Sequence, residues 1–328
     1  MKAIMYSRFG PPEVLELKEI PKPTPREHEV LIKVYATTVT AGDWRARTRN
    51  LPRGFGVIAR LFFGFSRPRQ PILGSELCGE IESVGKAVSK FKAGDQAFAF
   101  SGASLGCYVE YKCMPEDGAL ALKPANLSFE EAAAISFGGT TALMFLRRAK
   151  IQNGDNVLIN GASGGVGTAA VQLAKHFGAK VTGVCSTGNL ELVKSIGADK
   201  VIDYTKADFT QNGAAYDIIV DTVGTAPFSR SNRSLKEGGR LLLVLGTLPD
   251  MLQAPWVSMT SRKKVIAGPV SGGAEDLRFL AHLAESGQFK PVIDRRYPFE
   301  RIAEAHRYVD TGRKKGNVVI TLENRHQR

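Results

Sequence analysis

Short apolar runs separated by turn residues fill the first 123 residues of the chain. Glycine and proline clusters at 10–12 and 21–25 divide these runs, and a Gly-Asp turn follows at 94–95. Runs of this length between such turns predict an all-β module. The expected strands are 2–6, 13–19, 29–36, 80–84, 96–100 and 106–112.

Beyond Pro124, apolar runs alternate with helical patterns and glycine turns. Ser128 is the expected N-cap of a first helix, and residues 137–142 open a second. This alternation predicts a doubly wound parallel sheet. The expected strands are 156–160, 180–184, 200–202, 216–221, 240–245 and 264–267, followed by helices at 274–285 and 299–309 and by a terminal strand at 316–322.

A glycine-rich turn follows the expected strand 156–160 and opens a helix. This order suits a dinucleotide pyrophosphate, because free N–H groups at a helix N-terminus face the anion. The usual GxGxxG pattern begins here with alanine, and a glycine loop alone would be a weak signal, but the run 180–184 completes a βαβ unit. The candidate cofactor contacts in this turn are Ala162, Ser163, Gly164, Gly165, Val166 and Gly167.

The turn also carries the spacing of a known family. Gly154-Asp155-x-x-Leu158-x-x-x-Ala162-Ser163-Gly164-Gly165-x-Gly167, with Gln172 and Lys175, resembles the signature of the quinone oxidoreductase and ζ-crystallin branch of the medium-chain dehydrogenases/reductases. The resemblance extends over nearly the whole chain. It implies a Rossmann domain of residues 124–287, a discontinuous GroES-like β-barrel catalytic domain of residues 1–123 and 288–328, and a homodimer.

The same resemblance predicts an enzyme without zinc. In zinc-dependent relatives the metal ligands stand at the positions of Thr40, Ser75 and Phe137. Hydroxyl groups are poor zinc ligands beside thiolate and imidazole, and a phenyl ring is none. None of the five histidines stands with a second ligand at metal spacing.

Four polar residues are the candidate catalytic residues. The zinc-free branch commonly has the spacing N-x-x-D-x-x-x-R, which Thr40, Asp43 and Arg47 occupy, with threonine in place of asparagine. A tyrosine that often follows the arginine is absent from 48–56. By resemblance Thr141 lies beside the nicotinamide and the substrate. For Asp43 a structural role as a turn anchor, and for Thr141 a helix-capping role, are equal alternatives.

The end of the second Rossmann strand predicts the cofactor. Proteins that prefer NAD place a carboxylate there to bond the ribose 2′-hydroxyl. Cys185 occupies this place, and Ser186 and Thr187 follow, so that hydroxyls are available for the 2′-phosphate of NADPH. The family often has a basic residue where Asn189 stands, so NADH is possible too. Further candidate contacts are Tyr204, near the adenosine phosphate by resemblance, and Gly246, at a strand end.

The segment 45–69 has seven arginines, no acidic residue and an apolar centre at 57–63. Three interpretations are open. The first is a mobile lid over a hydrophobic substrate, and the second is a segment that lies on a membrane surface. The third is a short helix or loop that packs on the catalytic domain. Nucleic-acid binding through these arginines is a further alternative, for which the chain shows no recognised motif.

Composition narrows the class of protein. A chain of 328 residues with 43% hydrophobic residues is long enough for two domains. No apolar stretch reaches the ~18 residues of a membrane span. The four cysteines lack CxxC spacing, as expected for a reduced, cytoplasmic protein. The net charge of +12 is spread along the chain and indicates a basic surface; no nucleic-acid partner is expected.

These patterns predict an NADPH-dependent, zinc-free oxidoreductase that transfers hydride to a quinone or an activated alkene, with a small hydrophobic acceptor. One alternative is an alcohol dehydrogenase or carbonyl reductase, for which the sequence shows no acid. Another is a structural or regulatory protein that binds NADPH without turnover.

Overall fold

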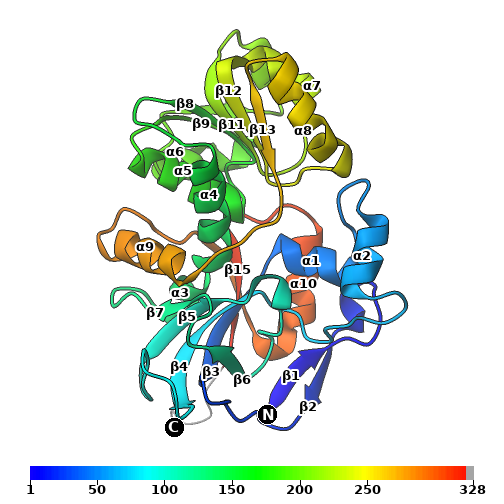
Figure 1. The fold of residues 1–328 in the computed structure, drawn as a ribbon, viewed down its shortest axis with the longest axis vertical. Helices are drawn as coiled ribbons and strands as arrows, with labels where there is room; N and C mark the ends of the chain where they lie inside the picture. The colour runs from blue at the N-terminus through cyan, green and yellow to red at the C-terminus, as the bar shows by residue number, and fades with distance from the viewer. Residues whose placement is uncertain (323–328) are drawn as a thin grey trace.

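Two β-sheets lie one above the other and carry the helices between and around them, as the computed structural model of residues 1–322 shows (Figure 1). The lower sheet has seven strands in the order β14-β15-β3-β4-β5-β7, with β6 paired to β3. A separate pair joins β1 (Lys2–Met5) to β2 (Glu16–Glu19). The strands of the lower sheet are β3 (Glu29–Val39), β4 (Glu76–Val84), β5 (Gln96–Phe100), β6 (Tyr111–Pro115), β7 (Leu120–Leu122), β14 (Ile293–Pro298) and β15 (Asn317–Thr321).

The upper sheet has six parallel strands in the order β10-β9-β8-β11-β12-β13, which confirms the predicted doubly wound sheet. The strands are β8 (Asn156–Asn160), β9 (Lys180–Cys185), β10 (Lys200–Asp203), β11 (Tyr216–Asp221), β12 (Leu235–Leu243) and β13 (Lys264–Ala267). The helices that follow or flank them are α4 (Ser136–Arg148), α5 (Gly165–His176), α6 (Leu190–Ser195), α7 (Phe228–Ser231), α8 (Leu248–Thr260) and α9 (Ala274–Glu285).

Both faces of the upper sheet are buried, because successive side chains of a strand point to opposite faces. In β8, Val157 and Ile159 belong to the core cluster that includes α4, α5 and α9, whereas Leu158 belongs to the cluster with Val257 of α8. All three strand residues are 0% exposed. Continuous apolar runs are typical of parallel strands covered on both faces.

The C-terminal segment returns to the lower sheet. Helix α10 (Ile302–Asp310) precedes β15, which pairs antiparallel with β3. The residues just before β15 also touch the upper half, since Gly316 forms an isolated parallel bridge with Gly164. This pairing supports the division into residues 1–123 with 288–328 and residues 124–287, which stays a prediction.

Several expected element bounds were wrong. The expected strand 13–19 is divided into a 3₁₀ turn (Pro12–Val14) and β2, and the expected strand 106–112 begins only at Tyr111. Residues 106–108 instead donate backbone hydrogen bonds to the loop 72–74. The expected N-cap was correct, since the Ser128 hydroxyl accepts from Glu131 N at the start of α3 (Phe129–Ala133).

Two helices lie between β3 and β4, in the region where the sequence left a lid, a membrane-surface segment and a short helix or loop as alternatives. Helix α1 (Ala41–Thr48) follows β3 after a single residue, and α2 (Gly56–Phe63) comes next. Helix α8 continues through Pro255, a residue that usually ends a helix. Both α1 and α2 lie beside the gap between the two halves of the molecule (Figure 1).

Candidate active site

The glycine turn is built by its own backbone. The N–H groups of Gly161 and Ala162 both donate to Val184 O, at 3.1 and 3.0 Å, which ties the turn to the end of β9. Gly161 has a φ of 81°, in the region that favours glycine. A Cβ on Gly167 would lie 2.0 Å from Gly161 O, so only glycine lets α5 pack this closely on its strand.

The N-terminus of α5 is open on the side where a pyrophosphate would lie. Gly164 is the N-cap, and a Cβ there would meet only Gly161 O, at 3.6 Å. Gly165 and Val166 line the adjoining cleft, whereas Ala162 is buried beneath the turn. This cradle fits the diphosphate of a nicotinamide dinucleotide, through the free N–H groups of a helix N-terminus.

The C-terminal segment completes this cradle, a contribution that the sequence pattern did not predict. Gly316 N donates to Ser163 O at 2.8 Å, and this bond brings the loop before β15 onto the glycine turn. Lys314 Nζ lies 3.3 Å, and Asn317 Oδ1 3.0 Å, from the position of a Cβ on Gly165. Both side chains line the cleft. A lysine about 150 residues from the turn carries no local signal that would have marked it.

The end of β9 corrects one premise of the cofactor prediction. Cys185 is 2% exposed, and burial raises the pKa of its thiol to about 11. Its register partner on β10 is Asp203, so a carboxylate does stand at this edge, supplied by the neighbouring strand. Thr187 Oγ1 donates to Asp203 at 2.5 Å, and Thr205 Oγ1 donates to it at 2.7 Å. These hydrogen bonds lower the pKa of Asp203, so the group stays charged.

The other residues proposed for the adenosine end lie in three different settings. Asn189 Nδ2 donates to Ser163 Oγ and Ser186 Oγ, at 3.1 and 3.2 Å. Asn189 Oδ1 is buried without a hydrogen-bond partner among residues 1–322, which suits a ligand donor at this point. Tyr204 is 63% exposed, and Gly246 is buried against Ala267, with Val244 and Leu245 before it lining the cleft.

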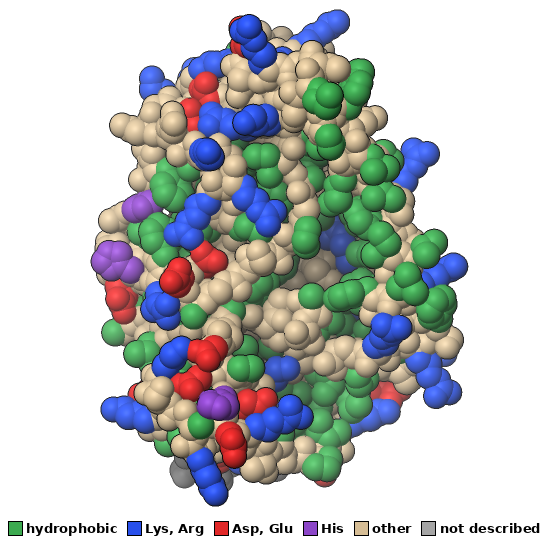
Figure 2. All heavy atoms as spheres, viewed as in Figure 1, with side chains coloured by type: hydrophobic (Ala, Val, Ile, Leu, Met, Phe, Trp, Pro, Cys, Tyr) green, Lys and Arg blue, Asp and Glu red, His purple; other side chains and the backbone are tan. Residues whose placement is uncertain are grey.

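A cleft of about 350 Å³ lies between the two halves. Figure 2 shows the hollow near the middle of this face, bordered by hydrophobic side chains. Of the four predicted catalytic residues, Thr40 and Thr141 line this cleft. The walls are otherwise largely apolar, and they include Trp44, Phe137, Val166, Leu245 and Val270.

Thr40 and Asp43 form the start of α1. Thr40 N and Oγ1 donate to Asp43 Oδ2 at 2.8 and 2.6 Å, and Asp43 N donates back to Thr40 Oγ1 at 3.1 Å. Asp43 Oδ1 accepts from Gly74 N at 3.0 Å. Burial raises the pKa of this fully enclosed carboxyl. Asp43 is thus placed as a helix-capping anchor behind the cleft, and the Thr40 proton is already committed to it.

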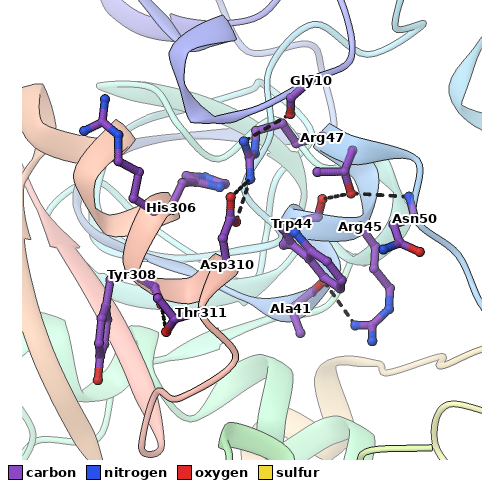
Figure 3. A network of polar contacts seen from close by, with 12 residues as sticks. Gly10, Ala41, Trp44, Arg45, Arg47, Asn50, His306, Tyr308, Asp310 and Thr311 are labelled. Carbon is purple, nitrogen blue, oxygen red and sulfur yellow. Dashed lines mark hydrogen bonds and ion pairs between the residues drawn. The ribbon is translucent and has the colours of Figure 1, made fainter.

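Arg47 is not in the cleft, contrary to its prediction as a catalytic residue. Its side chain is 0% exposed, and its Nη2 donates to both oxygens of Asp310 at 2.6 Å. Nη1 donates to Gly10 O at 3.1 Å. Figure 3 shows Arg47 between these two partners, while Arg45 leaves α1 in another direction and reaches the cleft wall. Arg47 therefore joins α1, α10 and the N-terminal segment, and we interpret it as a positioning residue.

Thr141 lines the cleft on α4, but its hydroxyl donates to Phe137 O at 2.6 Å. Phe137 N and Thr38 Oγ1 both donate to the carboxyl of Glu76, which is fully buried. Burial raises the pKa of Glu76 to about 8. This contact joins β4 of the lower sheet to α4 of the upper half and fixes one wall of the cleft.

The residues at the family's zinc positions do not fit a zinc ion. Thr40 Oγ1 is bonded to Asp43, Ser75 offers only a hydroxyl, and Phe137 has no donor atom. Within the described part of the chain, no three His, Cys, Asp or Glu side chains cluster so that they could hold a metal ion. Zinc independence stays a prediction, which elemental analysis of the purified protein would test.

The comparisons with known proteins agree with this architecture. The family model described as an alcohol dehydrogenase GroES-like domain matches residues 26–125, and one described as a zinc-binding dehydrogenase matches residues 196–320. The chain is 35% identical to 2-methylene-furan-3-one reductase of Solanum lycopersicum, over 98% of this chain and 79% of the relative. It is 34% identical to the chloroplastic NADPH-dependent alkenal/one oxidoreductase of Arabidopsis thaliana, with the same coverage. The solved structure of the quinone oxidoreductase from Coxiella burnetii superposes with a TM-score of 0.87 at 30% identity, covering 98% of this chain and 99% of that one.

A GroES-like lower half, a Rossmann upper half and a dinucleotide cradle at the cleft define a nicotinamide-dependent oxidoreductase. The chain belongs to the medium-chain dehydrogenase/reductase superfamily, in its quinone oxidoreductase branch. Among residues 1–322, none of the helices combines the length and the apolarity that crossing a bilayer requires.

Proposed function

We propose that the protein is an NADPH-dependent reductase of activated alkenes and quinones. The cleft carries this proposal, because it places the dinucleotide cradle against largely apolar walls and a single lysine. A flat, hydrophobic acceptor with a conjugated oxygen suits such a site. The names of two similar proteins, an alkenal/one oxidoreductase and a quinone oxidoreductase, point to the same class of acceptor.

NADPH is the proposed cofactor, with NADH also accepted. Gly164, Gly165 and the start of α5 would hold the diphosphate, and Ser186 with Asn189, which are hydrogen-bonded to each other, would contact the adenosine phosphate. Asp203 opposes a 2′-phosphate, but two threonine hydroxyls and Lys206, 4.0 Å away, partly offset its charge. The preference for NADPH is therefore expected to be modest.

Lys314 is the residue we propose as the electrophile of the site. Its Nζ donates to Gly316 O at 2.6 Å, and an ammonium group has two further N–H donors. Burial lowers the pKa of Lys314 to about 8, so the group is protonated at neutral pH and close to releasing its proton. The hydroxyls of Thr40 and Thr141, by contrast, already donate within the protein.

The reaction needs a hydride and a proton. When bound at this cradle, the nicotinamide would supply a hydride to the β-carbon of the acceptor. As that C–H bond forms, the C=C pair would shift toward the carbonyl carbon and the C=O π pair to oxygen, so that negative charge develops on the oxygen of an enolate. The Lys314 ammonium stabilises this charge by hydrogen bonding, and Lys314 or water delivers the proton that completes the reduction. The apolar walls limit access of water to the site.

NADPH oxidation, measured over a panel of quinones, enones, aldehydes and ketones, tests this function. We expect turnover of enones or quinones and none of simple ketones. Reduction confined to aldehydes and ketones would instead indicate a carbonyl reductase. Tight NADPH binding without turnover of any acceptor would indicate a structural or regulatory protein.

The role of Lys314 is tested by Lys314→Met, with the exposed neighbour in Lys315→Met as the matched control. We expect kcat to fall at least tenfold in Lys314→Met, about 1.4 kcal/mol or more, with little change in the control. In the parent, activity should decline as pH rises through about 8, because the cationic form is lost. A fall in NADPH affinity with unchanged kcat would reassign Lys314 to cofactor binding.

A homodimer and a cytoplasmic location, both expected from the sequence, remain proposals. The mass of the purified protein in sedimentation would test the first. Fractionation of cells would test the second.

A further inference from the structure

Helix α2 presents its apolar face to solvent rather than to the core. Ala59 is 2% exposed and Phe63 packs against the lower core, so these two residues, one turn apart, attach the helix to the protein. The rest of the helix surface carries large apolar side chains that are 47–69% exposed, namely Val57, Ile58, Leu61, Phe62 and, just beyond the helix, Phe65. Hydrophobic and basic side chains stand together at this edge of the molecule (Figure 2). Contiguous exposed apolar surface of this kind marks an interaction site.

The charge around this face has one sign. Exposed arginines precede the helix at Arg53, lie within it at Arg60 and follow it at Arg67 and Arg69. No Asp or Glu occurs between Asp43 and Glu76. Apolar residues set among arginines are the pattern of a segment that lies in the interface of an anionic bilayer.

Charge also argues against a second copy of the chain as the occupant. A two-fold contact would place the same patch on both sides of the interface. The arginines of one copy would then meet those of the other, with no carboxylate in the segment to pair with them. An anionic lipid surface complements both the arginines and the apolar side chains between them.

Helix α8 provides an internal comparison. It also exposes apolar side chains, Leu252, Trp256 and Met259, which are 66–85% exposed. Asp250 is the only charged residue within α8, and Arg262, Lys263 and Lys264 follow its end. Arg262 is paired with Glu237, and Lys263 donates to Asn232. A larger electrostatic contribution to membrane binding is therefore expected from α2 than from α8.

We propose that α2 and residues 65–69 form a docking surface for an anionic phospholipid membrane. The segment lies at the rim of the cleft, since Trp44 and Arg45 line the cleft just before it and Arg53 O accepts from Leu248 N at 3.0 Å. Docking would bring the cleft entrance to the surface in which apolar acceptors concentrate. The docking itself is independent of the proposed function, whereas its use in collecting the acceptor rests on that function.

The test is cosedimentation of the full chain with vesicles of phosphatidylcholine alone or mixed with phosphatidylglycerol, at low and at high salt. We expect binding to the mixed vesicles at low salt that weakens as salt rises, because surface charges are screened. Arg60→Glu with Arg67→Glu should weaken binding at least tenfold, and Leu61→Ser with Phe62→Ser should weaken it comparably. Neither pair lines the cleft, so NADPH binding and turnover of a water-soluble acceptor should be retained.

Two controls make the result specific. Arg262→Glu changes an exposed arginine just past the end of α8, where it pairs with Glu237, and Leu252→Ser with Met259→Ser changes the apolar face of α8. Both should leave vesicle binding as in the parent. The proposal is overturned if the parent does not bind mixed vesicles at low salt, or if the α8 variant loses binding as far as the α2 variants. It is also overturned if the α2 variants change only the oligomeric mass, because a second copy then covers this face. Vesicle binding by a protein that reduces no enone or quinone would leave docking intact and remove the proposed function alone.

Discussion

The two walls of the cleft differ in how far their contacts reach along the chain. In the glycine-turn wall, residues 156–185, the contacts that shape the turn itself join positions fewer than 30 residues apart, such as Gly161 N to Val184 O, and only the added C-terminal segment comes from far along the chain. In the α1–α2 wall, residues 40–69, the decisive contact joins distant segments, namely Arg47 to Asp310, 263 residues apart. The first wall could be interpreted from its own pattern, and the second could not.

This difference explains which roles were predicted well. Gly167 is required by its neighbour Gly161, whatever the rest of the fold does. Arg47 has the spacing of a family active-site residue, yet its surroundings turn it into an interior ion pair. A motif therefore identifies a residue's place in the chain, while the chemistry of that residue depends on what folds against it.

Gly167→Ala is the substitution expected to disrupt the glycine-turn wall most. The added Cβ would lie 2.0 Å from Gly161 O and 2.9 Å from the Ala162 backbone, neither of which can yield as a side chain would. We expect a loss of about 3 kcal/mol or more in stability and at least a tenfold loss in NADPH affinity. Urea unfolding and a binding titration measure both. Gly164→Ala, with its nearest contact at 3.6 Å, should keep the parent's stability; equal losses in both variants would contradict this account.

Arg47→Met is the substitution that most directly disrupts the α1–α2 wall. Loss of the ion pair with Asp310 should lower the free energy of unfolding by about 3 kcal/mol, and Asp310→Asn, which leaves the buried guanidinium unpaired, should do the same. Thermal unfolding and kcat for both variants give the answer. A large fall in kcat with an unchanged melting temperature would show that Arg47 acts on the substrate after all.

Glu76, whose carboxyl links β4 to α4, should make the stability of the protein depend on pH. Its folded pKa, about 8, exceeds the unfolded value of about 4.3, so the folded state retains a proton that the unfolded state has lost. Stability should then fall as pH rises from about 5 to about 8. Glu76→Gln should flatten this dependence and raise the melting temperature at pH 8 by roughly 5 °C. Parallel curves for parent and variant would mean that Glu76 is ionised in the folded protein.

A smaller effect is expected at the end of β9, beside the glycine-turn wall, where the choice between NADPH and NADH would be made. Asp203→Asn removes the carboxylate beside Cys185 and should raise the preference for NADPH over NADH about fivefold, corresponding to about 1 kcal/mol. Cys185→Asp, which adds a second carboxylate, should shift the preference toward NADH. The ratio of kcat/KM for the two cofactors is the measurement. An unchanged ratio in both variants would place the choice of cofactor elsewhere.

The sequence by itself determined the parts of the protein whose patterns are local. The parallel strands follow from continuous apolar runs, as in β8, and the Ser128 cap follows from its spacing to Glu131. The dinucleotide turn follows from glycines whose need is set by the adjacent backbone. These features depend on neighbours within a few turns of the chain, so one sequence contains the information.

Only the tertiary structure decided the rest of the site. The carboxylate beside Cys185 comes from the next strand, and Lys314 reaches the glycine turn because β15 pairs with β3. Arg47 is withdrawn from the cleft by Asp310, while the apolar side chains of α2 are left outside it. Whether a polar group is free to act depends on which partners the fold brings within hydrogen-bonding distance and on how much water it excludes. Neither quantity is written in the spacing of residues along a chain.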